Sequence, residues 1–105
     1  MSWNVVVLPE VYSDLGAAVG WYESKQEGLG ARFINEVLDL WTELEINPLL
    51  NSKRHPSRNV RWRYPKRFPY KVIYIVDENT ESVVVAAVLH AARHEKALMK
   101  RIQGK

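Results

Sequence analysis

Hydrophobic and polar positions alternate most clearly in the second half of the chain. β-Branched and aromatic residues dominate residues 67–77 and 82–90, and a short polar connection over 78–81 separates the two runs. Such side chains fit a pleated, half-buried surface, so the pattern predicts an antiparallel hairpin. A third strand is predicted over residues 59–64, where Val60, Trp62 and Tyr64 alternate with Arg61 and Arg63. Alternate side chains of a strand point to opposite faces, which predicts one basic face of the sheet.

Helical spacing of apolar residues is typical of the first half. A short β-rich run over residues 3–8 ends at Pro9, and an amphipathic helix is predicted from residue 10 to about residue 24. Residues 26–30 break the pattern, and a second helix is predicted from about residue 31 to residue 46, where Asn47 and Pro48 end it. Its buried stripe is expected to consist of Phe33, Val37, Leu40, Trp41 and Leu44. Because the connection is short, the two helices should form an antiparallel hairpin.

The predicted element order is β-α-α-β-β-β-α, in which the last element is a short C-terminal helix containing Leu98 and Ile102. This order indicates an α+β fold, with the αα-hairpin packed on one face of a mainly antiparallel four-stranded sheet. The other face is expected to stay partly open and to be lined by Arg61, Arg63 and, depending on register, either Lys71 or Tyr70 and Tyr74. The 105 residues are expected to form a single domain, residues 1–105.

Charge is unevenly distributed along the chain. Residues 1–46 carry a net charge of −6 and the remaining residues +9, and no acidic residue occurs between Glu45 and Asp77. The basic half should therefore attract polyanions or an acidic protein segment. There is no cysteine, no long apolar run and no signal-peptide pattern at residues 1–4, so we expect a cytoplasmic protein without a membrane partner.

Several fragments together resemble the RelE/ParE superfamily of type II toxin–antitoxin toxins, and especially its ParE-like, plasmid-stabilisation branch. They are Phe33 with Glu36, the Asn47-Pro48 helix stop, residues 67–74 (RFPYKVIY) and residues 88–93 (VLHAAR). The resemblance covers nearly the whole chain, in the family's order and with similar spacing. It implies the same fold that the periodicity predicts.

The ParE-like branch implies a toxin that inhibits growth by binding DNA gyrase and that an antitoxin neutralises. Such inhibition needs no catalytic residues, so the protein would not be an enzyme. Partners would be the cognate antitoxin, the target and a second toxin copy within the toxin–antitoxin complex. An acidic antitoxin tail should contact the basic surface. The residues expected to bind antitoxin or target are Arg54, Arg61, Arg63, Arg67, Lys71, Arg93 and Lys96.

The sequence is also compatible with two other functions. A RelE-like ribosome-dependent mRNA endoribonuclease needs a proton-transfer group and cations around the reacting phosphate, and the candidates are His90, Arg93 and Lys71. The alternative role for His90 is to cap the end of its strand, and Glu36 is either its carboxylate partner or a group that pairs helix and sheet. The third function is a non-toxic, basic nucleic-acid-binding domain. No cofactor is expected, and three scattered histidines predict no metal site.

Overall fold

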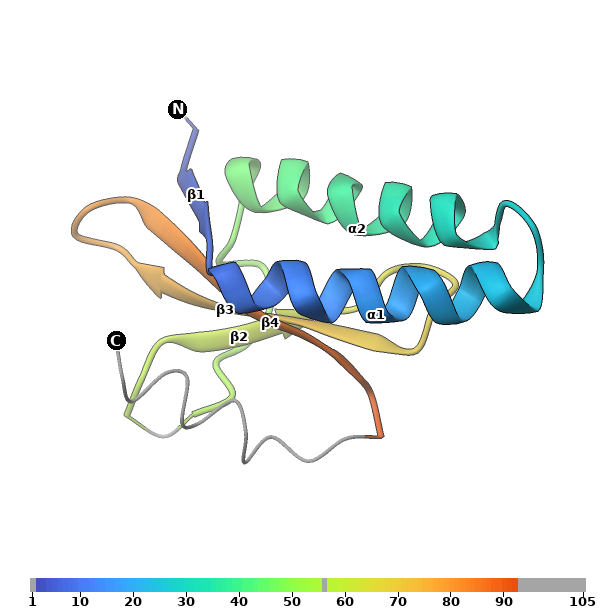
Figure 1. The fold of residues 1–105 in the computed structure, drawn as a ribbon. Helices are drawn as coiled ribbons and strands as arrows, with labels where there is room; N and C mark the ends of the chain where they lie inside the picture. Colours follow the sequence, from blue (N-terminus) through green and yellow to red (C-terminus); the bar gives the residue numbers. More distant parts are fainter. Residues whose placement is uncertain (1, 56, 93–105) are drawn as a thin grey trace.

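The computed structural model describes residues 2–55 and 57–92 (Figure 1). Its elements follow the predicted order as far as the last strand, and the predicted C-terminal helix lies outside the described residues. They are β1 (Asn4–Val7), α1 (Pro9–Lys25), α2 (Leu29–Ile46), β2 (Val60–Arg63), β3 (Tyr70–Asp77) and β4 (Ser82–His90).

The strands form one four-stranded sheet in the order β1-β4-β3-β2. The β2–β3 and β3–β4 pairs are antiparallel, whereas β1 runs parallel to β4, so the sheet is mixed and mainly antiparallel as predicted. Tyr70 pairs with His90 and Lys71 with Leu89 at the open end of the β3–β4 hairpin. The register shifts between Ile73 and Tyr74, where the facing strand contains one extra residue, and this irregularity is a β-bulge.

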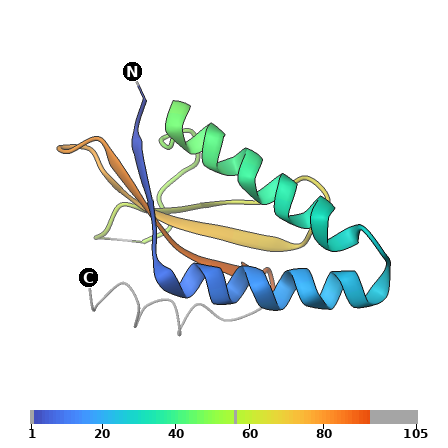
Figure 2. The ribbon, with the colours of Figure 1, turned by 45° about the horizontal axis from the view of Figure 1, so that its top comes forward.

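Both helices pack on the same face of the sheet, which confirms the two-layer arrangement. The turned view in Figure 2 shows α1 continuing directly from β1 and α2 returning beside it after the turn. The core between the layers includes Phe33, whose ring centroid lies 5.4 Å from that of Tyr22, 5.1 Å from Phe68 and 5.0 Å from Tyr70. The predicted stripe of α2 is buried except for Trp41, which is partly buried.

The start of α2 is held by a side chain from the preceding helix. Glu23 of α1 accepts hydrogen bonds from the backbone N–H groups of Gly28 and Gly30, both at 2.9 Å. Gly28 adopts a φ of 87°, a left-handed conformation that glycine reaches without steric cost. The first N–H groups of a helix have no partner within the helix, so the carboxylate both stabilises α2 and fixes the angle of the helical hairpin.

A second carboxylate connects α1 to the sheet. β1 pairs with β4 only as far as Val85, which leaves the later residues of β4 without a neighbouring strand on that side. Asp14 Oδ2 accepts a hydrogen bond of 3.0 Å from the backbone N–H of Val88 there. The helix therefore covers the part of the sheet edge that β1 is too short to pair.

Candidate functional site: a buried arginine pair and an exposed groove

The two arginines of β2 lie on the helix-facing side of the sheet, where they are buried. Arg61 is 8% exposed and Arg63 6% exposed, so the prediction that they line an open basic face is wrong. Arg61 pairs with Tyr74, and Arg63 pairs with Val72, both of which face the helices. Alternation alone misassigned the faces because it treats every arginine as facing solvent, whereas these guanidinium groups have local acceptors.

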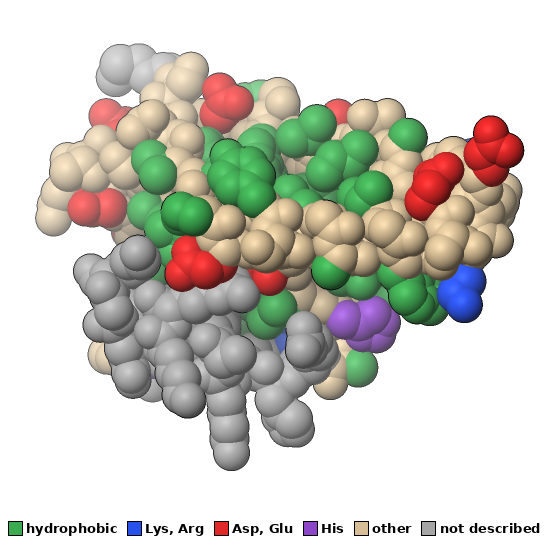
Figure 3. All heavy atoms as spheres, viewed as in Figure 1, with side chains coloured by type: hydrophobic (Ala, Val, Ile, Leu, Met, Phe, Trp, Pro, Cys, Tyr) green, Lys and Arg blue, Asp and Glu red, His purple; other side chains and the backbone are tan. Residues whose placement is uncertain are grey.

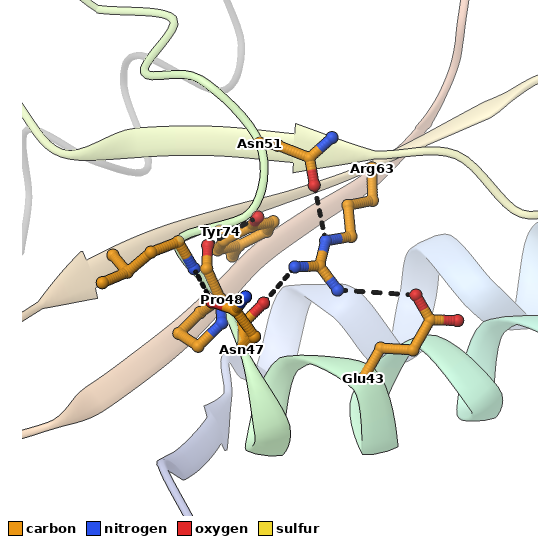
Figure 4. A network of polar contacts seen from close by, with 7 residues as sticks. Glu43, Asn47, Pro48, Asn51, Arg63 and Tyr74 are labelled. Atoms are coloured by element: carbon orange, nitrogen blue, oxygen red, sulfur yellow. Dashed lines mark hydrogen bonds and ion pairs between the residues drawn. The ribbon is translucent and has the colours of Figure 1, made fainter.

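Arg63 holds the segment that follows α2 (Figure 4). Its Nε donates to Asn51 Oδ1 at 2.6 Å, one terminal nitrogen donates to the carbonyl of Asn47, and the other lies 3.5 Å from Glu43 Oε1. Arg61 contacts the same segment through the carbonyls of Leu49 and Asn51. The pair therefore connects β2 to the end of α2 by charge-assisted hydrogen bonds.

Tyr74 completes this cluster from β3. It is fully buried, its hydroxyl donates to the carbonyl of Pro48 at 3.0 Å, and the Arg63 guanidinium lies 6.0 Å from its ring centroid. Burial raises the pKa of Tyr74, and the charges of Arg63 and Arg61 and a hydrogen bond from Arg63 oppose this rise. Only the protonated phenol can donate to Pro48, so the cluster depends on neutral Tyr74.

The opposite face of the sheet carries Lys71, Trp62 and Ile73. Lys71 Nζ and Arg54 Cζ each lie 5.0 Å from the centroid of a Trp62 ring, so the indole has cation–π contacts with both. Lys71 is 8% exposed, while Arg54 reaches this face from the exposed segment before β2. Of the cations predicted to line this face, Lys71 is the one that the structure places there, and Arg54, predicted to bind antitoxin or target, contacts the same indole. Lys71 and Ile73 are both buried, so this part of the face is not open as predicted.

His90 lies on the helix side, away from Lys71. Its strand partner Tyr70 contacts Tyr22 and Phe33 beneath the helices, and the His90 and Tyr70 ring centroids are 5.4 Å apart. The exposed His90 ring accepts a hydrogen bond of 3.1 Å at Nδ1 from the backbone N–H of Ala92. This contact is the strand-capping role expected as the alternative to catalysis.

The other predicted site residues are separated in the structure. Glu36 accepts a hydrogen bond of 3.0 Å from the backbone N–H of Arg67, so it pairs the helix with the sheet layer and contacts no histidine among the described residues. The side chain of Arg67 is exposed. Arg93 and Lys96 lie outside the described residues. Sequence reasoning missed Asn47 and Asn51, although an Asn-Pro helix stop indicates free carbonyl groups that a nearby cation can bind.

Two open grooves flank the helices. One, of about 700 Å³, lies between α2 and the segments on either side of β2. The other, of about 650 Å³, lies between α1 and the ends of β3 and β4 and includes His90. Figure 3 views the helical face, where acidic side chains lie around a mainly hydrophobic middle. The exposed helical surface of the described chain therefore differs in charge from the basic segment that follows it.

Within residues 2–55 and 57–92, no group of three histidine, cysteine, aspartate or glutamate side chains is placed to hold a metal ion. None of the helices in this part of the chain is long and apolar enough to cross a membrane.

Several solved structures from toxin–antitoxin systems share this fold. A chromosomal ParDE toxin–antitoxin system from P. aeruginosa matches with 13% identity over 84% of this chain and 95% of that chain, at a TM-score of 0.68. The toxin–antitoxin complex RelBE2 from Mycobacterium tuberculosis matches with 19% identity over 86% of this chain and 99% of that chain, at a TM-score of 0.59. A mutant of the E. coli toxin RelE in the free state matches with 10% identity over 99% of this chain and 97% of that chain, at a TM-score of 0.60. The architecture is thus RelE/ParE-like.

The family follows from the sequence match rather than from these distant structures. The model for the ParE toxin of the type II toxin–antitoxin system parDE matches residues 5–95. This chain belongs to the ParE toxin family, which confirms the resemblance seen in its sequence. No curated protein sequence matches it significantly.

Proposed function

We propose that this ParE-family toxin stops growth by binding and inhibiting a protein target in the cytoplasm, and that this target is DNA gyrase. We further propose that a cognate antitoxin neutralises it, as the toxin–antitoxin complexes among its structural relatives suggest. Gyrase is the target implied by the ParE-like sequence resemblance. The fold alone does not distinguish a gyrase inhibitor from an mRNA nuclease, because related folds support different functions.

The observation that favours inhibition by binding is the separation of the nuclease candidates. His90 shares the helix side of the sheet with Tyr70, whereas Lys71 contacts Trp62 on the opposite side. Cleavage of RNA requires a proton-transfer group and a charge-stabilising cation at the same phosphate. With the sheet between them, His90 and Lys71 do not meet this requirement together.

The two functions make opposite predictions for His90. On induction without antitoxin, we expect His90→Ala to reduce colony formation as strongly as the wild type does, at matched expression levels. We expect the purified wild-type toxin to inhibit gyrase supercoiling and to induce a DNA-damage reporter. Neutralising Arg93 and Lys96 is the companion variant, and it should restore colony formation because these cations are expected to contact the target.

Primer extension on cellular mRNA tests the alternative function, a ribosome-dependent nuclease. Cleavage at defined codon positions in cells that express the wild type, absent in cells that express His90→Ala, would establish a ribosome-dependent nuclease. Unimpaired supercoiling in the presence of excess toxin would equally exclude gyrase as the target.

A further inference from the structure

The groove beside α2 has a fixed shape because both ends are held by the chain itself. At one end Glu43 of α2 contacts Arg63, which also binds Asn51 (Figure 4). At the other end Glu36 accepts the backbone N–H of Arg67 at 3.0 Å. A binding surface that is already ordered loses less conformational entropy on association.

Apolar and acidic groups line this groove together. Leu40 forms part of its base at 5% exposure, while Leu50 is 73% exposed and Tyr64 is 50% exposed. Glu36, Asp39 and Glu43 follow one another at spacings of three and four residues, which places the three carboxylates on one side of α2. The groove thus presents apolar contacts beside a row of acids.

Asp39 is the carboxylate of this row that is available to a binding partner. Within residues 2–55 and 57–92, no hydrogen bond or ion pair involves Asp39, whereas Glu36 and Glu43 each have one. Arg63 is buried and already bonded, so Lys66 is the exposed cation among the lining residues. The charge of the groove therefore favours a cationic partner.

We propose that this groove is the docking site for a basic amphipathic segment of the antitoxin, in which an apolar side chain seats between Leu50 and Tyr64 and a lysine or arginine faces Asp39. This inference rests on the proposed function, which supplies the antitoxin as the partner. It differs in the sign of the antitoxin segment from the expectation of an acidic tail, which concerns the basic surface from Arg54 to Lys71. The two surfaces together describe an antitoxin with a basic and an acidic part.

The test measures the affinity of the purified cognate antitoxin for refolded toxin variants. Asp39→Lys and Leu50→Ser should each weaken binding about tenfold or more, because each removes a contact at the centre of the groove. Glu27→Lys makes the same charge change in the turn between the helices, and Leu38→Ser makes the same polar change on another part of α2. Both controls should bind within about twofold of the wild type. Thermal unfolding establishes that each variant is folded.

A charge exchange makes the test specific. Replacing the facing cation of the antitoxin by glutamate should restore its affinity for Asp39→Lys. Wild-type affinity for both groove variants would overturn this inference while leaving the proposed function intact. Toxin self-association that Asp39→Lys abolishes, without effect on the antitoxin, would overturn it by assigning the groove to a second copy. A wild-type toxin that binds no antitoxin would refute the proposed partnership itself.

Discussion

Arg63 acts as a substitute cap for a helix that lies far from it in sequence. α2 has no basic residue in its last turn, although its terminal carbonyl groups and its dipole both favour a cation there. Arg63 reaches this end from β2 and donates to the carbonyl of Asn47, the residue that ends the helix. A buried guanidinium group is stable here because acceptors from three sides replace its water.

Removing this side chain should destabilise the fold. We expect Arg63→Ala to lower the free energy of unfolding by about 2–3 kcal/mol, because the Asn47 and Asn51 acceptors lose a charged donor. Urea unfolding measures the change. Arg67→Ala is the matched control: its side chain is exposed and only its backbone contacts Glu36, so the loss should stay below about 0.5 kcal/mol. Equal losses in both variants would contradict the capping role.

Tyr74 should make stability depend on alkaline pH. Its pKa is raised above the usual 10.0, chiefly by burial, so the unfolded chain loses the phenolic proton at a lower pH than the folded protein does. The contribution of Tyr74 to the free energy of unfolding should therefore not change below about pH 10. Above this pH, the free energy of unfolding should fall as the pH rises through the raised pKa.

Substitution of Tyr74 separates this effect from general alkaline unfolding. Tyr74→Phe should cost about 1 kcal/mol at neutral pH through the lost hydrogen bond to Pro48, and it should make the decline above pH 10 shallower. Some decline should remain because burial also raises the pKa of Tyr22. Tyr12→Phe, at a position 65% exposed, should leave the slope unchanged, and an equally shallow decline there would refute the assignment to Tyr74.

At the level of elements, the pattern of apolar residues predicted the type of element correctly wherever buried apolar side chains dominate it. The stripe of α2 predicted a helix because one face of it is buried. The β3–β4 hairpin was predicted from its β-branched and aromatic runs, and both strands are in fact buried on both faces. The same reasoning failed for β2, where Arg61 and Arg63 belong to the buried side. Its faces depend on acceptors in residues 47–51, an irregular segment whose course no local pattern predicts. The exposed groove was missed for the same reason, since β2 and this segment form one of its walls.

The packing of α2 gives a prediction with an internal control. Phe33 is fully buried among three aromatic rings, so Phe33→Ala should lower the free energy of unfolding by about 3–5 kcal/mol. Leu38→Ala truncates an apolar side chain of the same helix that is 47% exposed, and it should cost below about 1 kcal/mol. A Phe33→Ala melting temperature within a degree or two of the wild type would contradict this packing.

The whole molecule separates its charges between its two halves. The acidic residues of α1 and α2 occupy the helical layer, while exposed Lys53 and Arg54 precede β2. With Arg61 and Arg63 buried, these two cations together with Lys66 and Arg67 are the exposed part of the predicted basic surface in the described chain. The chain therefore offers an antitoxin two surfaces of opposite sign.

This separation predicts a salt-sensitive complex. If an acidic antitoxin segment contacts Lys53 and Arg54, affinity should fall about tenfold or more as ionic strength rises from roughly 50 mM to roughly 500 mM, because salt screens exposed charges. A double variant, Lys53→Gln with Arg54→Gln, should bind more weakly at low salt and respond less to added salt. Lys25→Gln, at the far end of α1, should respond like the wild type. An affinity that stays constant across this range, or a double variant as salt-sensitive as the wild type, would exclude this segment as the docking surface for the acidic tail.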